Sequence, residues 1–172
     1  MPVSNIANSD TFKVTVPSDR EIRITRLFDA PRPLVYEAFT KPEHVRRWWG
    51  CLGEGYSVPV CEADVRPGGT WRYVNKTPNG SLAAFYGAYR EIVPPERLVF
   101  TEIYEPFPDG ESLVTVVFAE ENGKTRMTLT AEYPSIDVRD TVLKSGMESG
   151  AAISYDRLEE IAKELQQLSP VR

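Results

Sequence analysis

Glu102 is the residue of this sequence whose position most suggests acid–base chemistry. It lies in a strand-like run and shares one face with Leu98 and Phe100, which are apolar. A carboxyl group buried on such a face has a raised pKa or a cationic partner, and it can act as a general acid or base. The alternative is a residue at the rim of the sheet that reaches water. No second acid–base residue is evident, so the catalytic residues stay undetermined and we lean towards a protein that is not an enzyme.

The remaining reactive side chains argue against metal and nucleophile chemistry. The single histidine, His44, makes a Ser-His-Asp triad improbable and excludes most histidine-dependent metal sites. Cys51 and Cys61 lack the second pair or histidine that zinc requires. We therefore expect no metal and no cofactor. Two cysteines are also too few for a disulfide framework, so a reduced, cytoplasmic setting is expected.

A run of small residues interrupts the apolar stripe of the C-terminal segment. Gly150, Ala151, Ala152 and Ser154 occupy about one and a half helical turns. Small residues that face a concave sheet leave either close backbone packing or a cavity, and the sequence leaves both interpretations open. The many aromatic residues have the same two interpretations, as plain core or as the walls of a pocket.

Three helices should position these side chains. Proline in the first turn and four-residue apolar spacing predict a helix over 31–39. A second short helix is expected from Thr40, which forms a capping-box pattern with Glu43. Apolar residues every three or four positions predict one long helix over about 137–168, with Asp137 as its N-cap.

Eight strands are expected between turn signals such as Pro108-Asp109-Gly110 and Asn122-Gly123. The predicted ranges are 12–16, 21–28, 56–66, 69–76, 82–93, 97–105, 111–120 and 124–132. Their short connections make consecutive strands antiparallel, and their alternation predicts one apolar face. The fold class is thus α+β, with a curved antiparallel sheet covered on one side by helices. We expect residues 1–10 to be a loose tail and 11–168 a single domain.

Length and charge exclude several classes of partner. The chain has 172 residues and a formal net charge of −5, whereas nucleic-acid binding needs a basic surface. No run approaches the ~20 apolar residues that span a bilayer. The first dozen residues contain no Lys or Arg and no apolar core, so a secretory signal is not expected.

Several blocks of sequence carry a resemblance to a known family. RPGGTWRY at 66–73, YREIVPPERLVFTE at 89–102 and GKTRMTLT at 123–130 resemble homologues of the activator of the 90-kDa heat-shock chaperone's ATPase. The resemblance covers about 20–167 and implies the SRPBCC superfamily, with the helix-grip fold of START domains, birch-pollen-type allergens and polyketide cyclases. It implies a hydrophobic cavity between the long helix and the sheet, in which members bind lipids, steroids or polyketides and a minority catalyse reactions.

The sequence departs from this family at one informative position. Members often carry Gly-Trp in the long helix, where this chain has Gly150-Ala151. Replacing an indole by a methyl group should open volume beneath Trp71 and Tyr73 unless other side chains fill it. The loop 51–55 also differs from the commoner short Gly-Pro form.

Three functions follow as hypotheses. The first is binding of a small hydrophobic molecule, with Glu102 and Ser154 as its polar contacts. The second is a cyclase- or hydrolase-type enzyme that uses the same cavity, with Glu102 as its acid or base. The third is a module that interacts with a chaperone, and a homodimer is left open. The residues predicted to form the cavity are Trp49, Trp71, Tyr73, Phe85, Tyr89, Phe100, Glu102, Val116, Met127, Met147, Ala151, Ser154, Tyr155 and Leu158.

Overall fold

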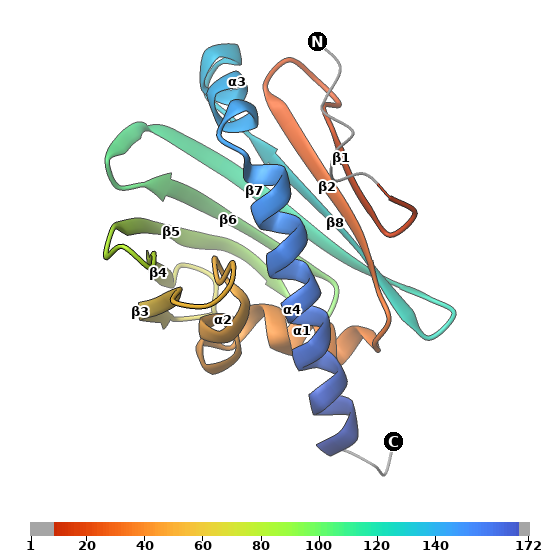
Figure 1. The fold of residues 1–172 in the computed structure, drawn as a ribbon. Helices are drawn as coiled ribbons and strands as arrows, with labels where there is room; N and C mark the ends of the chain where they lie inside the picture. The colour runs from red at the N-terminus through yellow and green to blue at the C-terminus, as the bar shows by residue number, and fades with distance from the viewer. Residues whose placement is uncertain (1–8, 169–172) are drawn as a thin grey trace.

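An eight-stranded antiparallel sheet is the frame of this computed structural model, which describes residues 9–168 (Figure 1). Strands β3 to β8 follow one another as a meander, and the first hairpin joins it by pairing β2 with β8. The sheet order is therefore β1-β2-β8-β7-β6-β5-β4-β3. The strands are β1 Phe12–Thr15, β2 Glu21–Phe28, β3 Ser57–Ala63, β4 Thr70–Lys76, β5 Leu82–Val93, β6 Arg97–Tyr104, β7 Phe107–Glu121 and β8 Lys124–Glu132.

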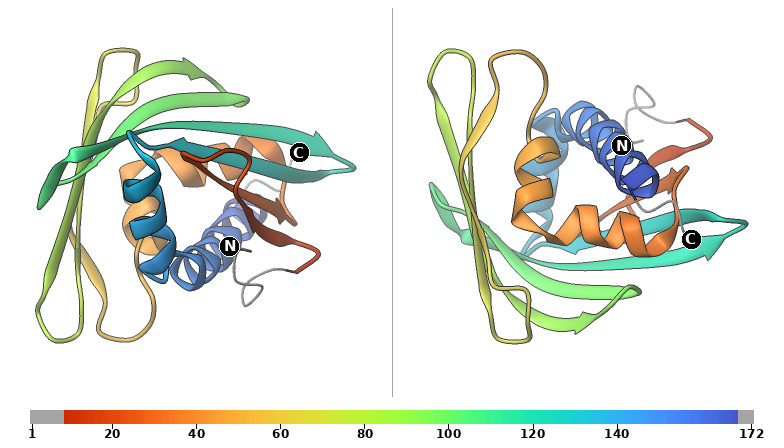
Figure 2. Two further views of the ribbon diagram at one scale, coloured as in Figure 1. Left: turned by 90° about the horizontal axis from the view of Figure 1, so that it is seen from above. Right: turned by 90° about the horizontal axis from the view of Figure 1, so that it is seen from below.

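Helices cover the concave face of the sheet. Helices α1 (Arg32–Thr40) and α2 (Pro42–Trp48) connect β2 to β3, whereas α3 (Ile136–Lys144) and α4 (Met147–Leu168) follow β8. Figure 2 shows the sheet curving around α4, with α1 and α2 closing one end of the space between them. This arrangement confirms the predicted α+β helix-grip fold.

The alternation within the strands predicted the buried face. In β7, Val114, Val116 and Phe118 are buried, while Val117 between them is exposed. In β8, Thr125 and Met127 are fully buried. These side chains belong to the core beneath the helices, since alternate residues of a strand point to opposite faces.

The predicted long C-terminal helix is two helices. Helix α3 ends at Lys144, and Gly146 adopts a φ of +84° before α4 begins at Met147. A glycine in the left-handed region is a common helix stop because it has no Cβ to clash with the backbone. The N-cap is Ser135, whose hydroxyl accepts a hydrogen bond from the Val138 N–H at 3.2 Å. The prediction of Asp137 as the cap was therefore wrong.

The capping box predicted at Thr40 is also absent. Thr40 is the last residue of α1, and its hydroxyl donates to the Tyr36 carbonyl at 2.8 Å. Lys41 caps α2 without a side-chain hydrogen bond. The hydroxyl is thus used by the preceding turn of its own helix, which is the local competition that Thr commonly offers.

The turn predicted at Pro108-Asp109-Gly110 lies inside β7. The β6–β7 hairpin reverses at Glu105 and Pro106, because Tyr104 pairs with Phe107. The next register pair joins Glu102 to Ser112, so β7 holds more residues than β6 between the two pairs. The Pro-Asp-Gly segment is accommodated as a bulge of the strand, which is where strands tolerate proline.

A buried arginine anchors the middle of α4 to the sheet. The Arg26 side chain on β2 is 7% exposed and lies 2.5 Å from the Asp156 carboxylate and 3.4 Å from that of Glu159. Its guanidinium also lies 5.1 Å from the centre of the Phe28 ring, within cation–π range. These contacts hold the middle of α4 against the sheet, and the space beneath the preceding part of the helix, from Met147 to Tyr155, forms the candidate site.

Candidate functional site

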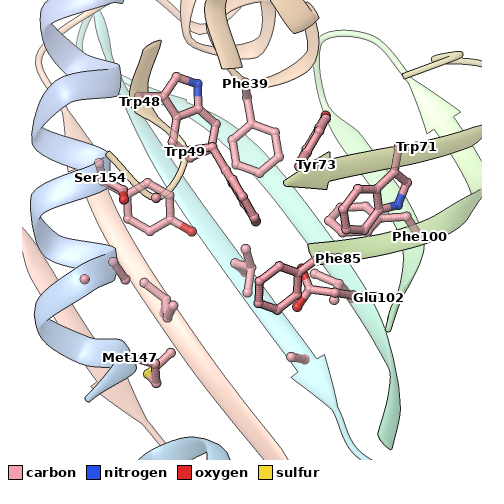
Figure 3. Close-up of a pocket in the computed structure, with 18 of the residues that line it drawn as sticks. Phe39, Trp48, Trp49, Trp71, Tyr73, Phe85, Phe100, Glu102, Met147 and Ser154 are labelled. Carbon is pink, nitrogen blue, oxygen red and sulfur yellow. The ribbon is translucent and has the colours of Figure 1, made fainter. Parts of the chain in front are cut away.

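A cavity of about 350 Å³ lies between the concave face of the sheet and the first half of α4 (Figure 3). Its volume is in the range of small-molecule sites, and most of its lining is apolar or aromatic. The walls come from β2, β4, β5, β6, β7 and β8, and the remaining sides from α1, α2, the loop after α2 and α4.

Aromatic rings form the wall on the β4–β6 side. Trp71 lies 4.9 Å from Tyr73 and 5.8 Å from Phe100, measured between ring centres. Trp49 reaches across from the end of α2 to within 5.4 Å of Tyr73 and 5.3 Å of Phe85. Such contacts lie in the range of favourable aromatic pairs, so the rings support one another as a stiff wall.

A glycine lets the Trp71 ring pack closely against the sheet. The Trp71 indole N–H donates to the Thr101 carbonyl at 3.2 Å. A Cβ at the neighbouring Gly87 would collide with that carbonyl and would lie 2.7 Å from the indole nitrogen. Gly87 therefore has a close-approach role, and it holds one wall of the cavity in place.

The roof of the cavity consists of small residues on α4. Gly150, Ala151 and Ser154 line it, and Met147 lies at the start of the helix. A Cβ at Gly150 would meet Leu52 methyl groups at 3.8 Å, an ordinary contact with no backbone nearby. Close helix–sheet packing therefore does not explain this glycine, and the small stripe lies over open volume.

The loop after α2 forms one border of the cavity. Gly50 and Leu52 line it, and the Gly50 carbonyl accepts a hydrogen bond from the Asn75 side-chain amide at 2.7 Å. Leu52 is 36% exposed and reaches α4 at Gly150. The loop thus spans from β4 to α4 at the edge of the pocket.

Glu102 is the charged residue of the cavity lining within the described part of the chain. It lies on β6, and its side chain points into the same space as Phe85 and Phe100 (Figure 3). None of the residues 9–168 forms a hydrogen bond or an ion pair with its carboxyl group. Desolvation by burial raises the pKa of Glu102 to about 7, from an ordinary value of 4.5. The group therefore exchanges its proton near neutral pH.

Tyrosine hydroxyls are the other polar groups at this wall. Burial raises the pKa of Tyr133 and of Tyr155, and the Glu102 carboxylate raises both further by charge repulsion. Burial also raises the pKa of Tyr89 to about 12, although the Tyr73 hydroxyl donates to it. All four tyrosines stay protonated at neutral pH, and since the Tyr73 proton is used by Tyr89, the hydroxyls of Tyr89, Tyr133 and Tyr155 are the ones with a proton to donate into the cavity.

The structure brings most of the predicted site residues together. Eleven of them line the cavity, namely Trp49, Trp71, Tyr73, Phe85, Tyr89, Phe100, Glu102, Met147, Ala151, Ser154 and Tyr155. Val116, Met127 and Leu158 do not, because each is fully buried in the solid core next to the cavity. Which of these residues contact a ligand stays a prediction.

Sequence reasoning did not include a second set of lining residues. Leu98, Val114, Leu129 and Ala131 share the buried strand face with predicted residues, so the alternation could have found them. The contributions of α1, α2, β2 and the adjoining loops depend on how distant segments meet. The lining residues missed in these segments and elsewhere are Ile22, Ile24, Phe39, Thr40, Trp48, Gly50, Leu52, Asn75, Tyr133 and Gly150.

The described residues offer neither a metal-binding cluster nor a reactive thiol. Between residues 9 and 168, no group of three or more His, Cys, Asp or Glu side chains is arranged to hold a metal ion. Burial raises the pKa values of the Cys51 and Cys61 thiols, which makes them poor nucleophiles at neutral pH. No helix in this part of the chain is both long and apolar enough to cross a membrane.

Comparison with known proteins identifies the family. The sequence profile described as Activator of Hsp90 ATPase homolog 1-like protein matches residues 29–163, which include strands β3 to β8 and all of the cavity lining except Ile22 and Ile24. The chain belongs to this family. The resemblance inferred from the sequence blocks is thereby confirmed. No curated protein matches the sequence.

Solved structures of bacterial proteins share the fold over nearly the whole chain. A protein from Rhodobacter sphaeroides is 25% identical, with a TM-score of 0.81 over 89% of this chain and 99% of its own. Protein Ms6760 from Mycobacterium smegmatis is 25% identical, with a TM-score of 0.75 over 87% and 96%. Protein CV1439 from Chromobacterium violaceum is 26% identical, with a TM-score of 0.73 over 85% and 99%. The helix-grip architecture is thus common to this family member and its structural relatives.

Proposed function

We propose that this family member binds a small, mainly apolar molecule in the cavity between the sheet and α4. One observation carries the proposal. A volume of about 350 Å³, lined by aromatic and aliphatic side chains, lies under a helical segment whose residues are Gly150, Ala151 and Ser154. Because a core normally fills such space, a void of this size with a few inward polar groups is typical of a ligand site.

Filling the cavity tests the proposal. Ala151→Trp places an indole where the helix now presents a methyl group. Ile153→Trp is the matched control, since Ile153 is on the same helix but 41% exposed and outside the cavity lining. The probe is adamantylmethanol, a neutral and compact apolar alcohol, and its binding is measured by isothermal titration calorimetry.

We expect Ala151→Trp to weaken binding of the probe roughly tenfold or more, since overpacking costs about 1–3 kcal/mol. Ile153→Trp should bind like the wild type. Unchanged affinity in Ala151→Trp would show that the probe does not occupy this cavity. Native mass spectrometry of protein purified from its own source, without organic solvent, then identifies a natural ligand by the mass of the adduct.

Catalysis in the same cavity is the second candidate, and Glu102 favours it. A carboxyl group with a pKa of about 7 can both give and take a proton at neutral pH, as a general acid or base must. Buried tyrosine hydroxyls nearby could orient a substrate. If Glu102→Gln abolishes turnover of a bound molecule while binding survives, the cavity is an active site. Unaltered turnover in Glu102→Gln would show that Glu102 is not the acid or base of a reaction in this cavity.

Association with a chaperone is carried by family membership and not by a feature of the site. A pull-down with the cognate 90-kDa chaperone tests it directly. Recovery of the chaperone by both the wild type and Ala151→Trp would place that interaction on the outer surface, independent of the cavity.

A further inference from the structure

The chemistry of the cavity wall restricts what its ligand can be. The wall offers aromatic faces, aliphatic side chains, the Met147 thioether, hydroxyl groups and the Asn75 carboxamide, whose amino group donates to the Gly50 carbonyl, together with one carboxyl group, that of Glu102. No Lys, Arg or His side chain lines the cavity in the described part of the chain. A ligand that fills this space therefore meets a potential negative charge and no positive one.

Glu102 lacks a partner inside the protein. Its carboxyl group receives no hydrogen bond from residues 9–168, and Ser112, its register neighbour on β7, donates to the Glu102 backbone carbonyl instead. A wholly neutral apolar ligand would displace water from the carboxylate and leave it unsatisfied, which is costly. An anionic ligand would add repulsion to that cost. A cation would provide both the opposite charge and the missing hydrogen-bond donors.

The aromatic wall is suited to the same kind of ligand. Trp71, Tyr73, Phe85 and Phe100 surround the part of the cavity into which Glu102 points (Figure 3). The faces of these rings carry partial negative charge and attract cations, most strongly where water is excluded. The net charge of −5 adds a general attraction for cations at longer range.

We propose that the natural ligand is an apolar cation: a hydrophobic body with one protonated amine held against Glu102 among the aromatic rings. This inference rests on the proposed ligand-binding function and specifies the chemical class of the ligand. Lipid-like carboxylates and fully neutral hydrocarbons are then poor ligands of this family member.

Binding of an amine should also release a proton from Glu102, which can be measured independently of affinity. The titratable groups that face Glu102 are Tyr133, which follows β8, and Tyr155 on α4, and both stay neutral over the working range of pH. An ammonium group stabilises the carboxylate form and so lowers the pKa of Glu102 from about 7. Binding of the amine therefore releases a proton near pH 6, and the affinity for it rises as pH increases from 5 to 8.

Three probes with the same apolar body test the ligand class: adamantylmethylamine, adamantylmethanol and adamantanecarboxylate. Calorimetry at pH 8 is expected to give the amine roughly tenfold or more higher affinity than the alcohol, and the carboxylate the lowest. In Glu102→Gln the preference for the amine over the alcohol should disappear. Glu120→Gln is the control, because it removes the same charge from an exposed position on β7.

The proton release is measured separately, at pH 6, in two buffers with different enthalpies of ionisation. The amine should show a buffer-dependent binding enthalpy with the wild type and none with Glu102→Gln. The buffer dependence of the binding enthalpy does not depend on the absolute affinity. Glutamate and glutamine at position 102 have nearly equal shapes, so the comparison isolates the ionisable group. Circular dichroism of Glu102→Gln establishes that the variant is folded.

The outcomes distinguish the preference for a cationic ligand from ligand binding itself. If the alcohol binds as tightly as the amine, or if Glu102→Gln keeps the amine preference, the inference about charge is wrong while the ligand-binding cavity stands. If none of the three probes binds, or if Ala151→Trp leaves all three affinities unchanged, the proposed function fails and the inference fails with it.

Discussion

The buried carboxyl group of Glu102 should make a contribution to stability that is present at acidic pH and lost at neutral pH. Glu102 has a pKa of about 7 in the folded chain, against an ordinary value of 4.5, because burial disfavours its charged form. Between these two pH values the folded state binds more protons than the unfolded state. The contribution of Glu102 to stability then decreases as pH rises, which is the opposite of the behaviour of a salt-bridged carboxylate.

The size of the effect follows from the two pKa values. At 1.36 kcal/mol per pKa unit, the difference between about 7 and 4.5 corresponds to about 3 kcal/mol. The contribution is fully present below about pH 4, has fallen by about 2 kcal/mol at pH 6, and is lost above about pH 8. Glu102→Gln replaces the ionisable group by a neutral one of similar shape, so the variant escapes this loss.

The assay compares the free energies of unfolding of the wild type and Glu102→Gln in urea between pH 4 and 8. We expect the variant to gain about 3 kcal/mol relative to the wild type across this range, because other titrating groups are common to both. Glu120→Gln controls for the change in net charge. A difference between wild type and Glu102→Gln that does not change with pH would refute the reasoning, since it would show that Glu102 is solvated in the folded protein.

Two further predictions concern α4. Gly150→Ala should raise the free energy of unfolding by about 0.5–1 kcal/mol, because alanine favours a helix and the added methyl group meets Leu52 at ordinary contact distance. Gly146→Ala is its control and should lower the free energy of unfolding, since Gly146 has a φ of +84°. A loss of stability in Gly150→Ala would contradict the open space beneath α4 at this position. Arg26→Ala should lower the free energy of unfolding, measured by urea denaturation, by about 2–3 kcal/mol, because it removes a buried cation that joins β2 to α4. Arg47→Ala breaks an exposed ion pair and should cost less than about 1 kcal/mol; equal losses in both variants would show that the burial of Arg26 does not matter.

Local pattern was sufficient to predict the eight strands and the first two helices in order, whereas it joined α3 and α4 into one helix. The two-residue alternation identified the buried face of β6, β7 and β8, and the apolar period identified the helical segments. It also placed Glu102 on the apolar face, because the side chain of every second residue must point the same way. The helix break at Gly146 and the cap at Ser135 were missed, and two other local motifs served a different purpose from the predicted one. Thr40 bonded its own helix and did not cap the next, and a Pro-Asp-Gly segment became a bulge and not a turn.

By itself, the sequence determined the α+β class, the strand faces, the stripe of small residues on the last helix and the presence of one carboxyl group on an apolar face. Only the tertiary structure decided that the stripe lies over a void. The distance between α4 and the sheet depends on side chains far apart in the chain: Leu158 fills the space at one end, while Gly150 and Ala151 leave it open at the other. The same holds for Glu102, since its pKa depends on desolvation by segments that meet around it only in the folded molecule.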